Sequence, residues 1–92
     1  MSQLSKACSI HPYFKINEGR HDEFKDLISS FIKSTSTEKT CLYYDFFING
    51  DLAYCREAYV DADALLAHLD NVGAHIEASG ELSEMIRLEM HG

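Results

Sequence analysis

The amino-acid sequence predicts an α+β fold of the ferredoxin-like type, with a four-stranded antiparallel sheet and both helices on one of its faces. Three observations predict this fold. A hairpin signal lies in the middle of the chain, an amphipathic helix pattern lies on each side of it, and strand-like segments lie at both ends. The expected order is β-α-β-β-α-β, and the 92 residues are expected to form one domain, 1–92.

The first strand is expected at residues 8–16, and Asn17-Glu18-Gly19 ends it. Pro12 conflicts with a central place for this strand, because proline donates no hydrogen bond to a neighbouring strand. A bulge, or pairing that begins only after Pro12, would resolve the conflict. In the first helix the apolar side chains recur with the spacing of one helical face: Phe24, Leu27, Ile28, Phe31 and Ile32. Residues 34–37 are expected to end it, because Ser and Thr side chains bond locally to the backbone.

The central hairpin joins residues 41–48 to residues 51–59 through Asn49-Gly50, a pair that favours a type I′ turn. Pairing Ile48 with Asp51 makes both faces of the hairpin largely apolar. One face then carries Leu42, Tyr44, Phe46, Ile48, Ala53, Cys55, Glu57 and Tyr59. The other face carries Cys41, Tyr43, Asp45, Phe47, Leu52, Tyr54, Arg56 and Ala58. A domain of this size covers one face with its own helices, so the second face predicts a partner subunit.

The second helix is expected to begin at Asp61, a residue type that caps helices. One side of this helix is apolar and consists of Ala62, Leu65, Leu66, Leu69 and Val72. Gly73 interrupts the helix, and a short second turn is expected at residues 76–78. Residues 85–90 alternate in polarity and complete the sheet as its last strand.

Composition excludes several classes of function. Eight basic residues stand against fifteen acidic ones, so the net charge of −7 disfavours nucleic-acid binding. The chain has neither an apolar run long enough to span a membrane nor the apolar core of a signal peptide, which predicts a cytoplasmic protein. The three cysteines, Cys8, Cys41 and Cys55, lack metal or redox spacing and are interpreted as small buried apolar residues. The hairpin pairing places Cys41 and Cys55 on opposite faces.

Four segments together resemble the antibiotic biosynthesis monooxygenase family: residues 12–19, the helix around Phe24, residues 40–43 and residues 56–69. The most specific of these is Glu57-x-Tyr59 followed by a helix that carries Ala67-His68. The resemblance implies a dimeric α+β barrel, a homodimer formed through the sheet face, and a small-molecule substrate. It also implies oxygenation of an electron-rich phenol or quinol in an apolar pocket, without a flavin, a metal or another cofactor.

Two residues are candidates for catalysis. The resemblance points to His68, which as a neutral imidazole would take a phenolic proton, whereas a half-exposed surface histidine is the structural alternative. Glu57 lies on an otherwise apolar face, where desolvation would raise its pKa and suit it to act as a base or hydrogen-bond anchor. The structural alternative for Glu57 is a salt bridge with Arg56 or Arg87, or a bond with the partner's backbone.

The substrate is expected to contact aromatic side chains and a second histidine: Phe14, Phe31, Tyr44, Phe46, Tyr59 and His75. Strand and helix spacing also explain the aromatic residues as ordinary core, and Gly73 leaves the direction of His75 open. No metal site is predicted, since neither His91 nor Glu77 stands at a recognised ligand spacing. The chain lacks tryptophan, and Pro12 follows His11 where the haem-degrading branch has asparagine, which argues against haem oxygenation.

Two alternatives to an oxygenase stay open at this point. One is a non-catalytic dimer that binds or senses a small ligand on the same scaffold. The other is an isomerase for a phosphorylated or carbonyl metabolite, which would need an anion clamp. Arg56 and Arg87 are the available anchors for such a clamp, and the scarcity of clustered basic residues argues against it.

Overall fold

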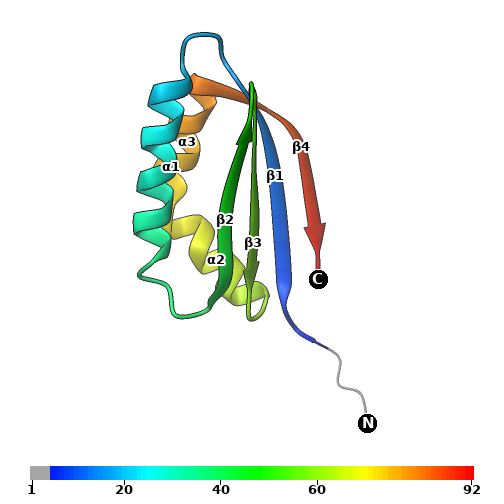
Figure 1. Ribbon diagram of the computed structural model, residues 1–92. Helices are drawn as coiled ribbons and strands as arrows, with labels where there is room; N and C mark the ends of the chain where they lie inside the picture. The colour runs from blue at the N-terminus through cyan, green and yellow to red at the C-terminus, as the bar shows by residue number, and fades with distance from the viewer. Residues whose placement is uncertain (1–4) are drawn as a thin grey trace.

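The computed structural model describes residues 5–92 and has the order β-α-β-β-α-α-β (Figure 1). Residues 1–4 lie outside this range. The elements are β1 (Cys8–Ile16), α1 (His21–Thr35), β2 (Cys41–Asn49), β3 (Leu52–Tyr59), α2 (Ala62–Asn71), α3 (Gly73–Leu82) and β4 (Ser83–His91). The strands form one antiparallel sheet in the order β2-β3-β1-β4. The ferredoxin-like α+β fold is therefore confirmed.

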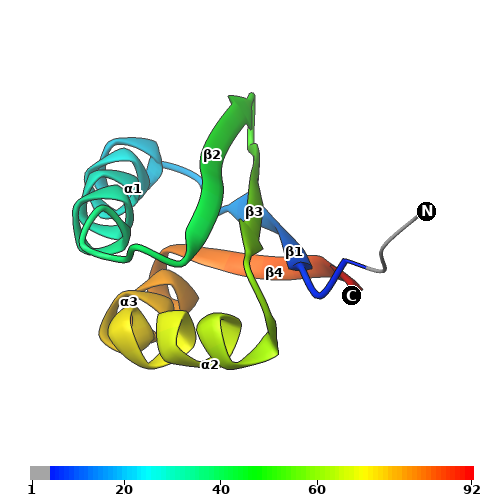
Figure 2. The same cartoon turned by 90° about the horizontal axis from the view of Figure 1, so that it is seen from below.

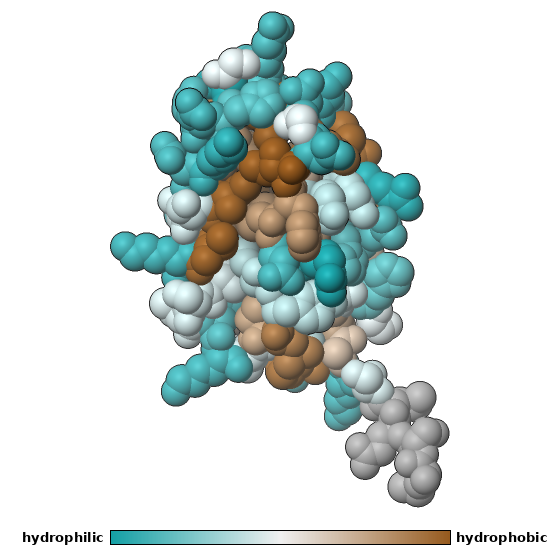
Figure 3. All heavy atoms as spheres, viewed as in Figure 1, coloured by the Kyte–Doolittle hydropathy of each residue, from teal (hydrophilic) through white to brown (hydrophobic). Residues whose placement is uncertain are grey.

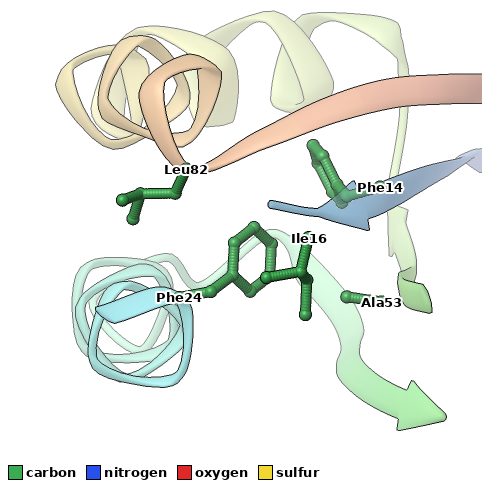
Figure 4. Close-up of a cluster of buried hydrophobic side chains, with 5 residues drawn as sticks. All are labelled: Phe14, Ile16, Phe24, Ala53 and Leu82. Atoms are coloured by element: carbon green, nitrogen blue, oxygen red, sulfur yellow. The ribbon is translucent and has the colours of Figure 1, made fainter. Parts of the chain in front are cut away.

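All three helices lie on one side of a curved sheet (Figure 2). The β2–β3 limb and β4 bend toward this side, and the opposite face of the sheet carries no helix. At one end of the sheet a hydrophobic cluster joins α1 and α3 to the strands. Its buried members are Phe14, Ile16, Phe24, Ala53 and Leu82 (Figure 4). This arrangement leaves the middle of the helix-covered face as the place where a site can form.

The first helix packs as its apolar spacing predicts at four of the five positions, whereas Ile32 at its C-terminal end is 46% exposed. Phe24 and Phe31 are buried, and Leu27 and Ile28 pack against the hydrophobic cluster. Hydrophobic side chains form a band where α1 meets β2, whereas the outer surface of α1 is hydrophilic (Figure 3). The helix is thus held to the sheet by one stripe of side chains.

The hairpin turn lies one residue later than expected. Asn49 pairs with Leu52 and Ile48 with Ala53, so Gly50 and Asp51 occupy the turn and the predicted pairing of Ile48 with Asp51 is wrong. Gly50 has a φ of 61°, and among residues 5–92 every residue with positive φ is a glycine. Positive φ at the first central position alone fits a type II′ turn rather than type I′. The register moves by two residues, so the two predicted faces keep most of their members.

The exception is the start of β2. A register shift between Cys41 and Tyr43 sets Cys41 opposite Tyr59 and leaves Leu42 exposed. Cys41 packs against the cluster that contains Tyr59, on the same side of the sheet as Cys55, so the prediction that the two cysteines face opposite ways is wrong. A bulge in the strand, which sequence alternation does not reveal, causes this difference.

Pro12 lies in a central strand, as its position in the sequence implies. The pairing of β1 with β3 includes Cys8–Ile10 and Tyr13–Lys15 but omits His11 and Pro12. On the other side β1 has a register shift against β4 between Tyr13 and Phe14. The strand therefore pairs with β3 both before and after Pro12. The missing N–H of Pro12 is accommodated by a local gap in the β1–β3 pairing.

The second half of the chain contains more helix than predicted. Asp61 caps α2 as expected, because its side chain accepts a hydrogen bond from the Ala64 N–H at 2.8 Å. Ala62 and Leu66 face outward rather than inward, and Ala64, Leu65 and His68 form the buried side. Residues 73–82 form a complete helix in place of the predicted short turn. None of the helices in residues 5–92 is long and apolar enough to cross a membrane.

Candidate active site

A cavity of about 280 Å³ lies between the sheet and the helices. Six of the eight predicted site residues line it: Phe14, Phe31, Tyr44, Phe46, Glu57 and His68. Further lining residues were not predicted as site residues: Ile10, Pro12, Leu69, Val72, Ile76, Ser79, Met85, Leu88 and Met90. The lining is therefore apolar except for Glu57, His68 and Ser79.

His68 lies on the buried side of α2 with 2% of its side chain exposed. Its Nδ1 atom lies 2.8 Å and 3.1 Å from the two carboxylate oxygens of Glu38. Its Nε2 atom lies 3.1 Å from Oε1 of Glu57, on the opposite side of the ring. Two ionised carboxylates at these positions would both accept hydrogen bonds, and only the imidazolium form of the ring donates from both nitrogens.

The charge balance around His68 agrees with this geometry. Burial lowers the pKa of His68 and is the largest single effect, but the interactions with Glu57 and Glu38 together outweigh it. The net result is a raised pKa for the imidazole. A histidine that is already protonated has no lone pair with which to take a proton from a substrate. The raised pKa therefore disfavours the predicted role of His68 as a neutral base, and its catalytic role stays a prediction. The structural alternative of a half-exposed surface histidine is excluded, because only 2% of the side chain is exposed.

Glu57 lies in the middle of β3, on the face that the helices cover. It is 5% exposed, and its Oε1 atom accepts a hydrogen bond from the Tyr59 hydroxyl at 2.7 Å in addition to the ion pair with His68. The arginines considered as partners lie elsewhere. Arg56 stacks on the ring of Tyr43, and Arg87 stacks on the ring of Tyr13. The bonds to Tyr59 and His68 both use Oε1 of Glu57, so neither of them involves the second oxygen, Oε2. The Glu57 side chain also lines the cavity.

Two tyrosines enclose this pair. The Tyr59 ring centre lies 4.7 Å from that of His68, and the Tyr44 ring centre lies 5.3 Å from it. Burial raises the pKa of both phenols, with Glu57 adding to the effect, so both hydroxyls stay neutral. Tyr44 lines the cavity, whereas Tyr59 is fully buried behind it and acts on Glu57 rather than on a ligand.

His75 and the cysteines lie outside this arrangement. His75 is on α3, where it shares a 3.0 Å hydrogen bond with Ser34 and meets the edge of the Phe31 ring. Burial is the main cause that raises the pKa of the Cys41 and Cys55 thiols, which disfavours a nucleophilic thiolate. Within residues 5–92 no group of three His, Cys, Asp or Glu residues is placed to hold a metal ion.

The site residue that sequence patterns missed is Glu38. It follows α1 in a short polar connection, where a glutamate ordinarily faces water. Its N–H donates to the Thr35 carbonyl at 2.9 Å, and its side chain turns inward to His68 and is only 11% exposed. Asn71 of α2 donates to Oε2 of Glu38 at 2.8 Å and to the Ser34 carbonyl at 2.9 Å. The contact between residues 38 and 68 is long-range and leaves no local signal.

The model of the family described as antibiotic biosynthesis monooxygenase matches residues 9–78. The crystal structure of MupZ from Pseudomonas fluorescens is similar to the whole chain, with 39% identity, a TM-score of 0.92 and 72% of its own chain covered. A second similar structure is a putative antibiotic biosynthesis monooxygenase from Caulobacter crescentus, with 19% identity, a TM-score of 0.84, and 95% and 89% of the two chains covered.

A third similar structure is that of SnoaB, a cofactor-independent oxygenase from Streptomyces nogalater. It has 13% identity and a TM-score of 0.82, and the match covers 96% of this chain and 93% of that one. The similarity to the Caulobacter and Streptomyces structures shows the shared fold alone. No curated protein sequence matches the chain.

Proposed function

Because this chain belongs to the antibiotic biosynthesis monooxygenase family, we propose that it binds a small, electron-rich aromatic molecule and oxygenates it without a cofactor. The observation that carries the proposal is Glu57, a carboxylate in an apolar cavity, paired with an imidazolium and hydrogen-bonded by a buried tyrosine. Such a carboxylate has the role of general base. The name of the Streptomyces structure, a cofactor-independent oxygenase, supports this class of reaction.

The substrate is proposed to be an uncharged phenol or quinol. Among the described residues that line the cavity there is no Lys or Arg, so a phosphate or carboxylate group would lack a counter-ion. The cavity lining continues onto β4, where Met85, Leu88 and Met90 remain 47%, 48% and 61% exposed. These side chains offer an apolar surface to the part of the substrate that does not react.

The reaction follows from the position of Glu57. The substrate hydroxyl donates its proton to Oε2 of Glu57, and the resulting phenolate is electron-rich enough to reduce oxygen directly. For a phenol, the ring C–H carbon para to the phenolate oxygen would become C=O and the phenolate C–O would become the second C=O of a quinone. One atom of O₂ is retained and the other leaves as water, so the substrate is the only reductant. The imidazolium of His68 stabilises the negative charge that the carboxylate and the phenolate share in the cavity.

The test has two stages. A thermal-shift screen with phenols, naphthols and quinols identifies bound compounds, and the hits are then placed in an oxygen electrode with the wild type, Glu57→Gln and Glu77→Gln. We expect Glu57→Gln to reduce oxygen uptake by about 100-fold or more, since the amide cannot accept a proton. Glu77 is exposed on α3 and carries the same charge, so its variant should behave as wild type. Binding without protein-dependent oxygen uptake for every hit would refute the oxygenase.

A second candidate is a proton-transfer reaction within an uncharged substrate, such as an isomerisation. The paired Glu57 and His68 favour it, because proton transfer to and from a carboxylate needs no oxygen. Incubating each hit without oxygen and analysing the products separates the two reactions. A ligand that is bound but unchanged with and without oxygen would instead indicate a binding or sensing protein.

We also propose that a second copy of the chain covers the helix-free face of the sheet. Phe47, Tyr54 and Tyr13 stack in a row across this face, with ring centres 4.9 Å and 5.4 Å apart, and Arg87 extends the row onto β4. Phe47 is 40% exposed within one chain. Apolar rows of this kind mark protein interfaces, which supports a homodimer through the sheet face.

A further inference from the structure

Glu38 is the only described residue that contacts the His68 ring nitrogens from outside the sheet. Both of its carboxylate oxygens lie within 3.1 Å of Nδ1, so the single N–H is shared between them, and the shorter contact of 2.8 Å to Oε2 has the length of a charge-assisted hydrogen bond. The side chain gives up most of its solvent contact to make it. Removing the glutamate from water is unfavourable unless a partner compensates for it, and a charged imidazole is such a partner.

The orientation of Glu38 is itself fixed by other residues. Asn71 donates to Oε2 of Glu38 and also to the carbonyl of Ser34 at the end of α1. The amide of Asn71 therefore ties the helix that carries His68 to the connection that carries Glu38. The bonds of Asn71 to Glu38 and to Ser34 therefore hold the Glu38 carboxylate in its orientation toward His68.

We propose that Glu38 is a positioning residue of the active site, which holds His68 as an imidazolium and thereby keeps Glu57 ionised inside the apolar cavity. The inference rests on the proposed role of Glu57 as the base. Two carboxylates and one imidazolium give the buried group one net negative charge, so Glu57 can accept one substrate proton. Without Glu38, His68 would keep only one of the two carboxylates that raise its pKa, so its imidazolium form would be less stable and Glu57 would lose part of its positive partner.

The other groups that face His68 do not share this charge. Tyr44 and Cys41 of β2 and Tyr59 of β3 are titratable, and burial keeps each of them neutral. From α2 the neighbouring polar group is the amide of Asn71, and His75 of α3 is bonded to Ser34 instead. The protonation of His68 therefore depends on the two glutamates.

The experiment is a pH titration of the histidine ring nitrogens by ¹⁵N NMR, which needs no substrate. The signals of His68 are assigned from a His68→Gln variant, and wild type is compared with Glu38→Gln, Glu38→Asp and the surface control Glu77→Gln. In wild type and in Glu77→Gln, both nitrogens of His68 should have imidazolium shifts at neutral pH. In Glu38→Gln the midpoint should fall by roughly one pH unit or more, and Glu38→Asp should recover part of that shift because it restores the charge.

A midpoint that is the same in Glu38→Gln and wild type, in variants whose melting curves show them folded, would overturn the positioning role. This result does not depend on the oxygen-uptake experiment. If the midpoint falls but no phenol supports oxygen uptake, the oxygenase proposal fails while the role of Glu38 toward His68 stands. If uptake is found, Glu38→Gln should lower kcat more than it raises KM, and the acidic limb of its pH profile should move.

Discussion

Glu57 and His68 contact each other in the wall of an apolar cavity, and each stabilises the charged form of the other. A buried carboxylate without a counter-ion would tend to be neutral, and a buried imidazole would tend to lose its proton. The 3.1 Å ion pair between them, with Glu38 on the far side of the ring, reverses both tendencies. At the scale of single residues the site is therefore a charge network rather than a free histidine base.

The raised pKa of His68 predicts how stability changes with pH. A group whose folded pKa lies above its unfolded value, near 6.5, stabilises fully below that value and loses its effect as the pH rises through the folded pKa. The difference in free energy of unfolding between wild type and His68→Gln should therefore shrink as the pH rises from about 6.5 through the higher pKa of the folded state. Urea unfolding at a series of pH values measures it. A difference that grows with pH would contradict the imidazolium assignment.

Tyr59→Phe tests the second partner of Glu57. The variant removes the hydroxyl that donates to Oε1 at 2.7 Å and leaves the buried ring in place. We expect a loss of about 1–3 kcal/mol in the free energy of unfolding, because a buried carboxylate loses a hydrogen bond. Tyr44→Phe, which removes a phenol without a bond to Glu57, is the comparison for urea unfolding. Equal losses in the two variants would show that the Tyr59 bond is not special.

At the scale of elements, α2 is the helix that carries His68 to the cavity, and its first turn depends on Asp61. The Asp61 side chain accepts from the Ala64 N–H, which would otherwise be unpaired at the helix start. Asp61→Ala should cost about 1 kcal/mol of the free energy of unfolding. Asp63→Ala, an exposed acid in the same turn that caps nothing, should cost clearly less. Urea unfolding of both variants checks the difference.

Local patterns predicted most elements well. They failed where the outcome depends on pairing or packing between segments. The apolar stripe of α1 and the cap of α2 follow from side chains within a few residues of each other. The turn at Gly50 and the full length of α3 do not, since a two-residue shift in hairpin register keeps the same faces. Packing of α3 against α1 and the sheet overrides the helix-weakening glycines, Gly73 and Gly80.

At the scale of the whole molecule, the helix-free face of the sheet is the feature that one chain leaves unexplained. If a second copy covers it, Phe47→Asp should convert the protein to a monomer, because it would bury an unpaired charge in the interface. Leu66→Asp is the matched control, since Leu66 is 61% exposed on the outer side of α2. Sedimentation velocity over a range of concentrations distinguishes the two. A monomeric wild type would contradict the homodimer.

The order of the strands and of the first two helices and the helix-covered face of β3 were readable from the sequence. Both depend on periodicity along a single element, where hydrophobic burial selects one face. The inward direction of His68 did not follow from the predicted apolar stripe of α2, which omits this residue. The partners of those residues were not readable. Glu57 is bound by His68 and Tyr59 rather than by an arginine, and Glu38 reaches His68 from a connection thirty residues earlier in the chain. Only the tertiary structure decides such contacts, because they form between elements that have no common local pattern.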